Sequence, residues 1–247
     1  MGSDTEGNSA AAVSHHNGRV RAMAGTLYLV AIPIGNWEDV TFRALRILKQ
    51  VDLVVYEEQK EGSRFLRHYG IEKPGECLNE HNESEESQIL LERIRSGISV
   101  ALISDAGTPV FSDPGQLLVQ KAIQQGIKVV PIPGASSLLP ALIVSGFPLS
   151  QFLFRGFLSP KRPRRIEELQ QLKREARTIV LMDAPYRLVQ LMGDVADVMG
   201  PTRRVSVAFD LTLPTEEIFH GTAAELAKRF AREKRKGEFV VILEADK

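Results

Sequence analysis

A segment of twelve residues, 104–115 (SDAGTPVFSDPG), holds two Asp, two Gly and two Pro directly after an apolar run. This density of turn-forming residues indicates an ordered loop with many accessible peptide groups. Peptide N–H and C=O groups bind an adenine edge or an amino-acid moiety without long side chains. We therefore expect a ligand at this loop. Asp105 either accepts a hydrogen bond from that ligand or caps the turn itself.

Other turn residues follow apolar runs elsewhere in the chain. Asp113 stands before Pro114 and a helical pattern, so we expect it to be the N-cap of that helix. Ser136 and Ser137 open an apolar helix, where they cap it or hold a ligand carboxylate at its positive end. Residues 33–36 (PIGN) form a plain turn or let a flat ligand approach the backbone.

Short apolar runs alternate with helical patterns from residue 26 to residue 146. This alternation predicts a parallel sheet with crossover helices, whose ligand site lies at the carboxyl ends of its strands. The expected strands are residues 27–32, 52–56, 100–104 and 129–132. The expected helices lie within residues 39–50, 63–70, 80–97, 113–126 and 136–145.

The pattern changes after Gly146, and consecutive strands there can pair in a mixed or antiparallel sheet. We therefore predict an α/β chain with a parallel-sheet domain at 25–147 and a mixed-sheet domain at 148–247. Residues 1–24 are rich in Ser, Ala, Gly and Asn, which predicts a disordered leader. The expected strands of the second domain are residues 152–157, 178–183, 204–209 and 238–244. Its expected helices are residues 166–174, 188–199 and 222–236.

Composition excludes several classes of protein. With 31 Lys and Arg against 31 Asp and Glu, the formal net charge is zero, so any nucleic acid must be bound through local basic patches. Two basic stretches could form such patches, a loop at 161–165 and a helix face at 228–236, and Arg155 and Arg187 could extend a patch. Alternatively, both stretches are ordinary solvated surface.

A single cysteine, Cys77, indicates the reducing cytoplasm and no metal site. No apolar run approaches the ~20 residues that cross a bilayer, so we expect no membrane segment.

Four motifs in order carry a family resemblance: LYLVAIPIGN, EHNE, LISDAGTPVFSDPG and VVPIPGASSLLPAL. They resemble the tetrapyrrole-methylase-like superfamily and, within it, the 16S ribosomal RNA cytidine 2′-O-methyltransferases. The resemblance extends from Thr26 to about Leu243. It implies two α/β domains with S-adenosylmethionine in the cleft between them, a homodimer, and ribosomal RNA of the small subunit as the methyl acceptor.

The resemblance also implies which residues contact the cofactor. Asp105, next to these contacts in the sequence, is a further candidate contact. Without the resemblance, Met182 is interpreted as a residue of the apolar core. The implied contacts are Pro33, Ala106, Gly107, Thr108, Phe111, Ser112, Ser136, Ser137, Met182 and Ala208.

A 2′-hydroxyl acceptor requires a group that takes its proton. The candidates are the carboxylates Glu57, Glu58 and Glu80, and His81, the only histidine in a candidate site loop. The EHNE motif that contains the last two is equally well explained as a polar helix start.

Three segments depart from the family pattern, at 56–62 (YEEQKEG), 182–187 (MDAPYR) and 209–213 (FDLTL). They fall on loops expected to face the acceptor, whereas the cofactor loops keep the family residues. Two alternatives therefore stand beside RNA methylation: methyl transfer to a small-molecule or protein acceptor, and a non-catalytic module that binds S-adenosylmethionine.

Overall fold

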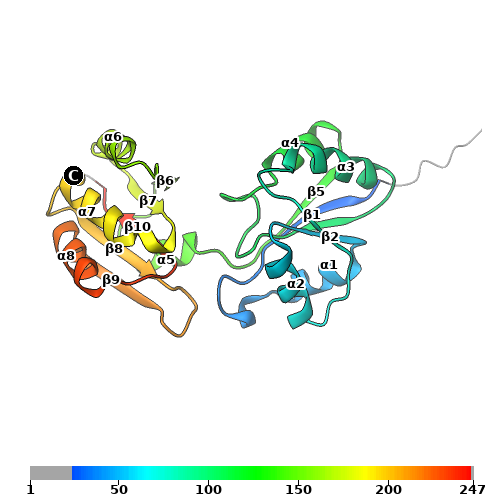
Figure 1. Cartoon of the computed structure of the whole chain (residues 1–247), viewed down its shortest axis with the longest axis horizontal. Helices are drawn as coiled ribbons and strands as arrows, with labels where there is room; N and C mark the ends of the chain where they lie inside the picture. Colours follow the sequence, from blue (N-terminus) through cyan, green and yellow to red (C-terminus); the bar gives the residue numbers. More distant parts are fainter. Residues whose placement is uncertain (1–23, 246–247) are drawn as a thin grey trace, which may run out of the picture.

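The computed structural model describes residues 24–245, so all but one residue of the predicted leader lies outside the described part. The described chain forms two five-stranded sheets, each with its own helices. Figure 1 shows the two halves along the long axis of the molecule, with the blue-to-green half on the right and the green-to-red half, which includes α5, on the left.

The first sheet has the order β3-β2-β4-β1-β5, and every neighbouring pair is parallel. The predicted parallel sheet is confirmed. Residues 75–77, which have no apolar run, add an edge strand that the sequence did not predict. The strands are β1 (Thr26–Val30), β2 (Leu53–Tyr56), β3 (Gly75–Cys77), β4 (Val100–Leu102) and β5 (Lys128–Ile132).

Helices cover both faces of this sheet, which explains why its strands are apolar throughout. Alternate residues of β2 point to opposite faces: Val54 and Tyr56 pack toward α1 and α2, whereas Leu53 and Val55 pack toward α3 and α4. Figure 1 shows these two helix pairs on opposite sides of the sheet. The helices are α1 (Phe42–Gln50), α2 (Gln59–His68), α3 (Glu83–Arg95) and α4 (Gln116–Gln124); a 3-10 turn, η1 (Trp37–Asp39), precedes α1.

The second sheet has the order β6-β7-β10-β8-β9. Its β6–β7 pair is parallel and its other pairs are antiparallel, so the predicted mixed sheet is confirmed. The strand β9 was not predicted, because its polar sequence EIFHGT shows no clear alternation. The strands are β6 (Phe152–Phe157), β7 (Thr178–Met182), β8 (Arg204–Phe209), β9 (Glu217–Thr222) and β10 (Phe239–Leu243).

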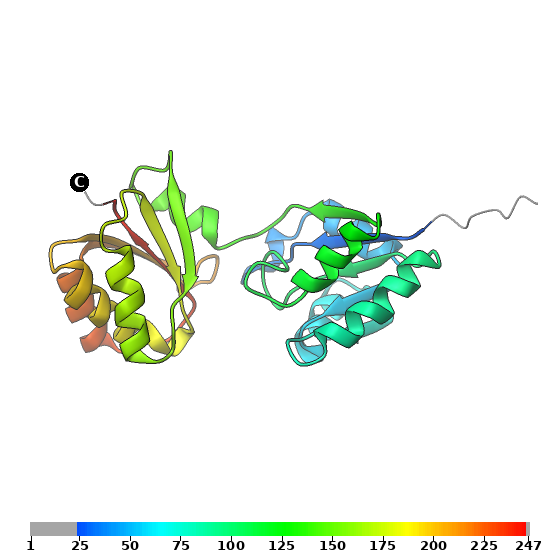
Figure 2. The ribbon, with the colours of Figure 1, turned by 90° about the horizontal axis from the view of Figure 1, so that it is seen from above.

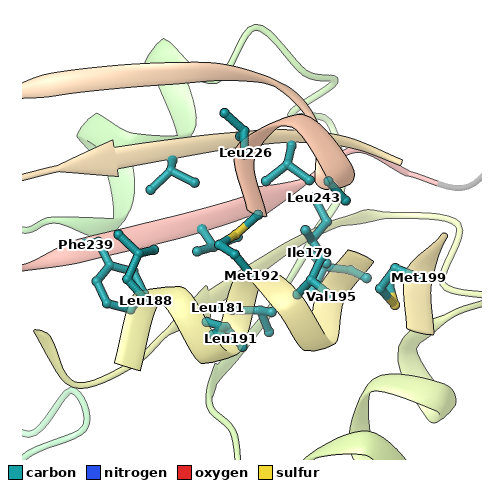
Figure 3. Packing of buried hydrophobic residues seen from close by; sticks show 14 of the residues in the cluster. Ile179, Leu181, Leu188, Leu191, Met192, Val195, Met199, Leu226, Phe239 and Leu243 are labelled. Carbon is teal, nitrogen blue, oxygen red and sulfur yellow. The ribbon is translucent and has the colours of Figure 1, made fainter. Parts of the chain in front are cut away.

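The largest apolar core lies between this sheet and three helices. Figure 3 shows Leu188, Leu191, Met192 and Val195 along one helix, facing Ile179 and other side chains of the sheet. A capping box between Thr222 and Glu225 fixes the start of the last helix. The helices are α6 (Arg162–Leu172), α7 (Leu188–Met199) and α8 (Ala223–Glu233); a 3-10 turn, η2 (Pro185–Arg187), precedes α7.

Helix α5 (Leu138–Val144) covers the opposite face of the second sheet. Its buried residues Ala141 and Leu142 pack with Ala208 of β8 and with Val240 and Ile242 of β10. The helix thus precedes the predicted division at 147/148 but packs with the half that follows it. In Figure 2 the green segment after β5 crosses from one half to the other before α5 begins.

Candidate functional site

A cavity of about 370 Å³ lies where the carboxyl edge of the first sheet faces the second half. Its volume is in the range of cavities that hold small organic ligands. The first half contributes loops that follow β1, β4 and β5, and the second half contributes the ends of β6, β7 and β8 and the start of β10.

Nine of the eleven residues predicted to contact the cofactor line this cavity. Pro33 and Asp105 do not; the residue after Pro33, Ile34, takes a place in the wall. The nine are Ala106, Gly107, Thr108, Phe111, Ser112, Ser136, Ser137, Met182 and Ala208.

Eight further residues line the cavity that the sequence did not suggest as ligand contacts. Phe157 and Asp183 end predicted strands, so the rule that ligands bind at strand ends could have found them. Glu238, Phe239 and Val240 begin an antiparallel strand, for which that rule gives no signal. The eight are Ile34, Asp113, Phe157, Asp183, Leu211, Glu238, Phe239 and Val240.

The loop between β4 and α4 is held in an unusual backbone conformation. Gly107 and Ile32 exchange both backbone hydrogen bonds, of 2.9 and 3.1 Å, which fixes the loop against the end of β1. Val110 and Ser112 both have φ near 71°, in the left-handed region. Residues other than glycine rarely adopt this region, and a β-branched residue such as Val110 does so least of all. Backbone strain of this kind is kept where surrounding contacts impose it and is frequent at ligand sites.

Several contacts join the halves near the cavity. The backbone N–H of Asn36 donates to Oγ1 of Thr212 at 3.0 Å, and Gly35 lies so close to Leu213 that a Cβ would stand 2.9 Å from Cδ2 of that leucine. The ring centroids of Phe111, which lines the cavity, and Phe154 lie 4.6 Å apart. Segment 209–213, which departs from the family sequence pattern, therefore lies at the junction between the halves.

The charged groups in the cavity wall are all acidic. Asp113 comes from the first half, Asp183 and Glu238 come from the second, and none of the described Lys or Arg residues lines the wall. Burial, and next the charge of Asp105, raise the pKa of Asp113 to about 6. Burial also raises the pKa of Glu238, with a smaller contribution from Asp210. The cavity is therefore suited to a cationic ligand.

Asp183 is tied to the fold as well as to the cavity. Its Oδ1 accepts the backbone N–H of Ala184 at 2.8 Å and pairs with Nη1 of Arg187 at 2.9 Å. Burial raises its pKa, and the charge of Arg187 partly opposes that effect. Arg187 is buried and its Nη2 donates to the carbonyl of Ser159, so the expectation that it extends a surface patch is wrong.

The prediction that Asp113 caps α4 is wrong. The N-cap of α4 is Gly115, whose φ of 113° requires a glycine conformation. The helix N-terminus is capped instead by Glu83, whose Oε1 accepts the backbone N–H groups of Gly115 and Leu117, both at 2.9 Å. Glu83 belongs to the EHNE motif, so part of this motif is structural.

The four candidate proton acceptors chosen from sequence, Glu57, Glu58, Glu80 and His81, lie outside the cavity wall. His81 is exposed, and its backbone N–H donates to the side chain of Asn79 in a turn before α3. Glu80 is also exposed. Glu57 is half-buried beside Asp105, and burial, followed by the charges of Asp105 and Asp113, raises its pKa to about 7.

The two basic stretches are largely neutralised. Residues 161–165 were predicted to be a loop, but they form the first turn of α6, where Arg165 is buried and pairs with Asp194 at 2.7 Å. In the second stretch, Arg229 and Arg235 both pair with Glu217. The predicted helix there ends at Glu233, three residues early, since Lys234 adopts a left-handed conformation.

Among the described residues, no group of three or more His, Cys, Asp or Glu side chains could hold a metal ion. The described helices include none that is long and apolar enough to span a bilayer.

Comparison with known proteins shows which family has this sequence pattern. The family model for tetrapyrrole (corrin/porphyrin) methylases matches residues 26–227. The chain belongs to the tetrapyrrole methylase family. This finding confirms the resemblance, and the chain, like its family, is a methyltransferase.

Curated relatives in this family are similar over most of their length. The ribosomal RNA small subunit methyltransferase I of Pseudomonas aeruginosa is 44% identical over 222 residues, which are 89% of this chain and 79% of the relative. The corresponding protein of Pasteurella multocida is 42% identical over 224 residues, 90% of this chain and 80% of the relative.

Solved methylases share the fold at much lower identity. Uroporphyrin-III C-methyl transferase from Thermus thermophilus, complexed with S-adenyl homocysteine, is 22% identical with a TM-score of 0.61, covering 89% of this chain and 97% of the other. A cobalt precorrin-4 methyltransferase is 18% identical with a TM-score of 0.64, covering 89% and 94%.

Proposed function

We propose that this tetrapyrrole methylase family member transfers the methyl group of S-adenosylmethionine to ribosomal RNA of the small subunit, at a ribose 2′-hydroxyl of a cytidine. The observation that carries the proposal is the cavity between the halves, which gathers nine predicted cofactor contacts from separate loops. The curated relatives supply the acceptor class, since they are named as ribosomal RNA methyltransferases.

The charge of the cavity fits this methyl donor. S-adenosylmethionine carries a sulfonium and an ammonium group, and the described residues of the wall offer three carboxylates and no basic side chain. The exposed peptide groups of the loop after β4 suit its adenosine and amino-acid parts. The donor supplies an activated methyl group, so the protein's main task is to align the two substrates and exclude water.

The acceptor approaches, in this proposal, from the side of α6. Phe157 lines the cavity at the end of β6, and the first turn of α6 begins five residues later. The side chains of Arg162 and Arg164 on that turn are 64% and 68% exposed, so their pairing with nearby acids leaves them open to phosphate. The pair of Arg164 with Glu167 has both side chains exposed and contributes little energy, so its exchange for phosphate is inexpensive, whereas Arg162 also pairs with the buried Asp194.

The test is transfer of labelled methyl from S-adenosylmethionine to small ribosomal subunits, with nucleotide mapping of the product. We expect 2′-O-methylcytidine in the RNA of the small subunit. Label in a protein or in a tetrapyrrole, with none in RNA, would contradict the acceptor. Binding of the donor with no turnover on any RNA would favour a non-catalytic module instead.

A matched pair of variants locates the donor. Phe111→Ala removes a ring that lines the cavity, and we expect about tenfold weaker donor binding by calorimetry, from the loss of roughly 1.4 kcal/mol of contact. Phe42→Ala removes a ring that is 94% exposed on α1 and should bind the donor normally. Equal affinities in the two variants would place the donor elsewhere.

We further propose that the protein acts in the cytoplasm as a homodimer. The outer face of α5 supports the dimer: Leu139 and Ile143, one helical turn apart, are 59% and 71% exposed, although the opposite face of the helix is buried in the second half. Large apolar side chains exposed together are typical of interaction surfaces. A second copy of this chain is the proposed partner.

A further inference from the structure

Asp113 occupies a position that the fold itself does not explain. Its residue type and its place before Pro114 are those of a helix cap, but Glu83 provides the cap of α4 from another helix. Within the described part of the chain, the carboxylate of Asp113 makes no hydrogen bond and no ion pair. A half-buried carboxylate without a partner costs stability, and function is a common reason for keeping one.

The backbone holds Asp113 rigidly at the cavity. Ser112 before it is in the left-handed region, and Pro114 after it has a restricted backbone and restricts Asp113 in turn. Asp113 lines the cavity together with Ser112 and with residues of the second half. The restricted backbone of this segment keeps Asp113 at the cavity wall.

Burial and the neighbouring carboxylate of Asp105 increase the affinity of Asp113 for a proton. Asp105 follows β4 and Glu57 follows β2, and both interact with Asp113 electrostatically. Asp183 and Glu238 line the same cavity from the second half. Burial is the largest effect and Asp105 the next, and together they raise the pKa of Asp113 to about 6. A base with a pKa just below the working pH is ionised and still takes up a proton readily.

We propose that Asp113 is the group that accepts the proton of the attacking hydroxyl during methyl transfer. This inference rests on the proposed function. The hydroxyl oxygen forms a bond to the methyl carbon, the bond from that carbon to sulfur breaks, and its electron pair stays on the sulfur. The proton of the hydroxyl passes to the carboxylate of Asp113, which later releases it to water. The products are the methyl ether, the neutral thioether and the regenerated carboxylate.

The assignment places the proton acceptor at a residue outside the four acid–base candidates chosen from sequence. Glu57 does not line the cavity and is not the proton acceptor in this assignment; burial, followed by the charges of Asp105 and Asp113, raises its own pKa. Glu80 and His81 have no role in it.

The test compares Asp113→Asn with the parent protein across pH, using small ribosomal subunits as acceptor and calorimetry for the donor. We expect kcat to fall by about 100-fold or more in the variant, since general-base catalysis contributes on that scale. Donor affinity should change by less than about threefold. The parent kcat should decline below pH 6, and this acid limb should be absent from the variant. Asp113→Glu should recover part of the rate.

Asp39→Asn is the control, because it removes an exposed carboxylate on η1. It should keep both the rate and the acid limb. An Asp113→Asn variant with normal kcat, or with an unchanged acid limb, would overturn the inference. A loss confined to donor affinity would overturn it too, since Asp113 would then bind the donor's cation. If the parent protein itself transfers no methyl to RNA, the proposed function has failed and not the inference alone.

Discussion

Individual side chains in the second half are held by a small buried ionic network. Arg165 and Asp194 are 2% and 4% exposed, and Arg165 also donates to the carbonyl groups of Ser159 and Pro160. Arg187 donates to the same carbonyl of Ser159 and pairs with Asp183 in the cavity wall. The loop that carries Ser159 is therefore fixed by two buried guanidinium groups.

Removing one partner of this network should be costly. In Arg165→Leu, Asp194 keeps only Arg162, whose side chain is largely exposed. We expect the free energy of unfolding, measured by urea denaturation, to fall by about 3 kcal/mol. Arg164→Leu removes an exposed arginine of the same turn and should cost less than about 1 kcal/mol. An equal fall in the free energy of unfolding of both variants would contradict a larger contribution from the buried Arg165–Asp194 pair.

At the residue level, sequence reasoning succeeded where the backbone motif determines the role. The composition of loop 104–115 predicted a ligand there, the family resemblance named Ala106, Gly107 and Thr108 as contacts, and all three line the cavity. It failed at Asp113 and Arg187, because local spacing does not reveal that Glu83 provides the cap or that Asp183 draws the arginine inward. Both failures come from contacts between residues that the sequence alone does not bring together.

Among the elements, α4 depends on a residue from its neighbour. The carboxylate of Glu83 at the start of α3 accepts two backbone N–H groups at the N-terminus of α4, where a negative charge is also favourable to the helix dipole. The same contact ties α3 to the end of the loop that lines the cavity. The two helices are thus joined by a polar contact as well as by their apolar faces.

Glu83→Ala should therefore destabilise the protein by about 1–2 kcal/mol in thermal or urea unfolding. Glu85→Ala, a change at an exposed position in the same first turn of α3, should cost under about 0.5 kcal/mol. We also expect weaker donor binding in Glu83→Ala, since the loop end is released. Equal stability of the two variants would contradict the capping role.

The elements that the sequence predicted well are those with a strong apolar pattern. The helix predicted at 188–199 and the strand predicted at 204–209 have the bounds that the structure gives α7 and β8. The strands β3 and β9 were missed because they are short or polar and gain their order from pairing with β2 and β8. Such pairing is a property of the assembled sheet, which local sequence does not encode.

At the scale of the whole molecule, the cavity lies at the junction of two halves that have separate apolar cores. The fold class and the family were predictable from sequence, because the strand–helix alternation and four motifs report them directly. The full lining of the cavity was not predictable, because it combines residues from the ends of seven strands and their loops, which meet only after both sheets form.

The proposed dimer can be tested by measuring the mass of the protein in solution. Ile143→Glu places a charge in the middle of the exposed face of α5, and we expect light scattering to report a monomer of 27.4 kDa where the parent protein gives twice that mass. Ile123→Glu makes the same change at a residue that is 63% exposed on α4, and it should remain dimeric. A parent protein that is monomeric at micromolar concentration would refute the proposed dimer.

The position of α5 determines how the chain can be dissected. A fragment that starts at residue 148 leaves behind Ala141 and Leu142, and so strips the cover from Val180 and Ile242 on one side of its sheet. Such a fragment would expose an apolar sheet face to water and would aggregate. Starting the fragment at Ser136 keeps the helix with the strands that it shields, and this is where recombinant truncation or domain exchange should be made.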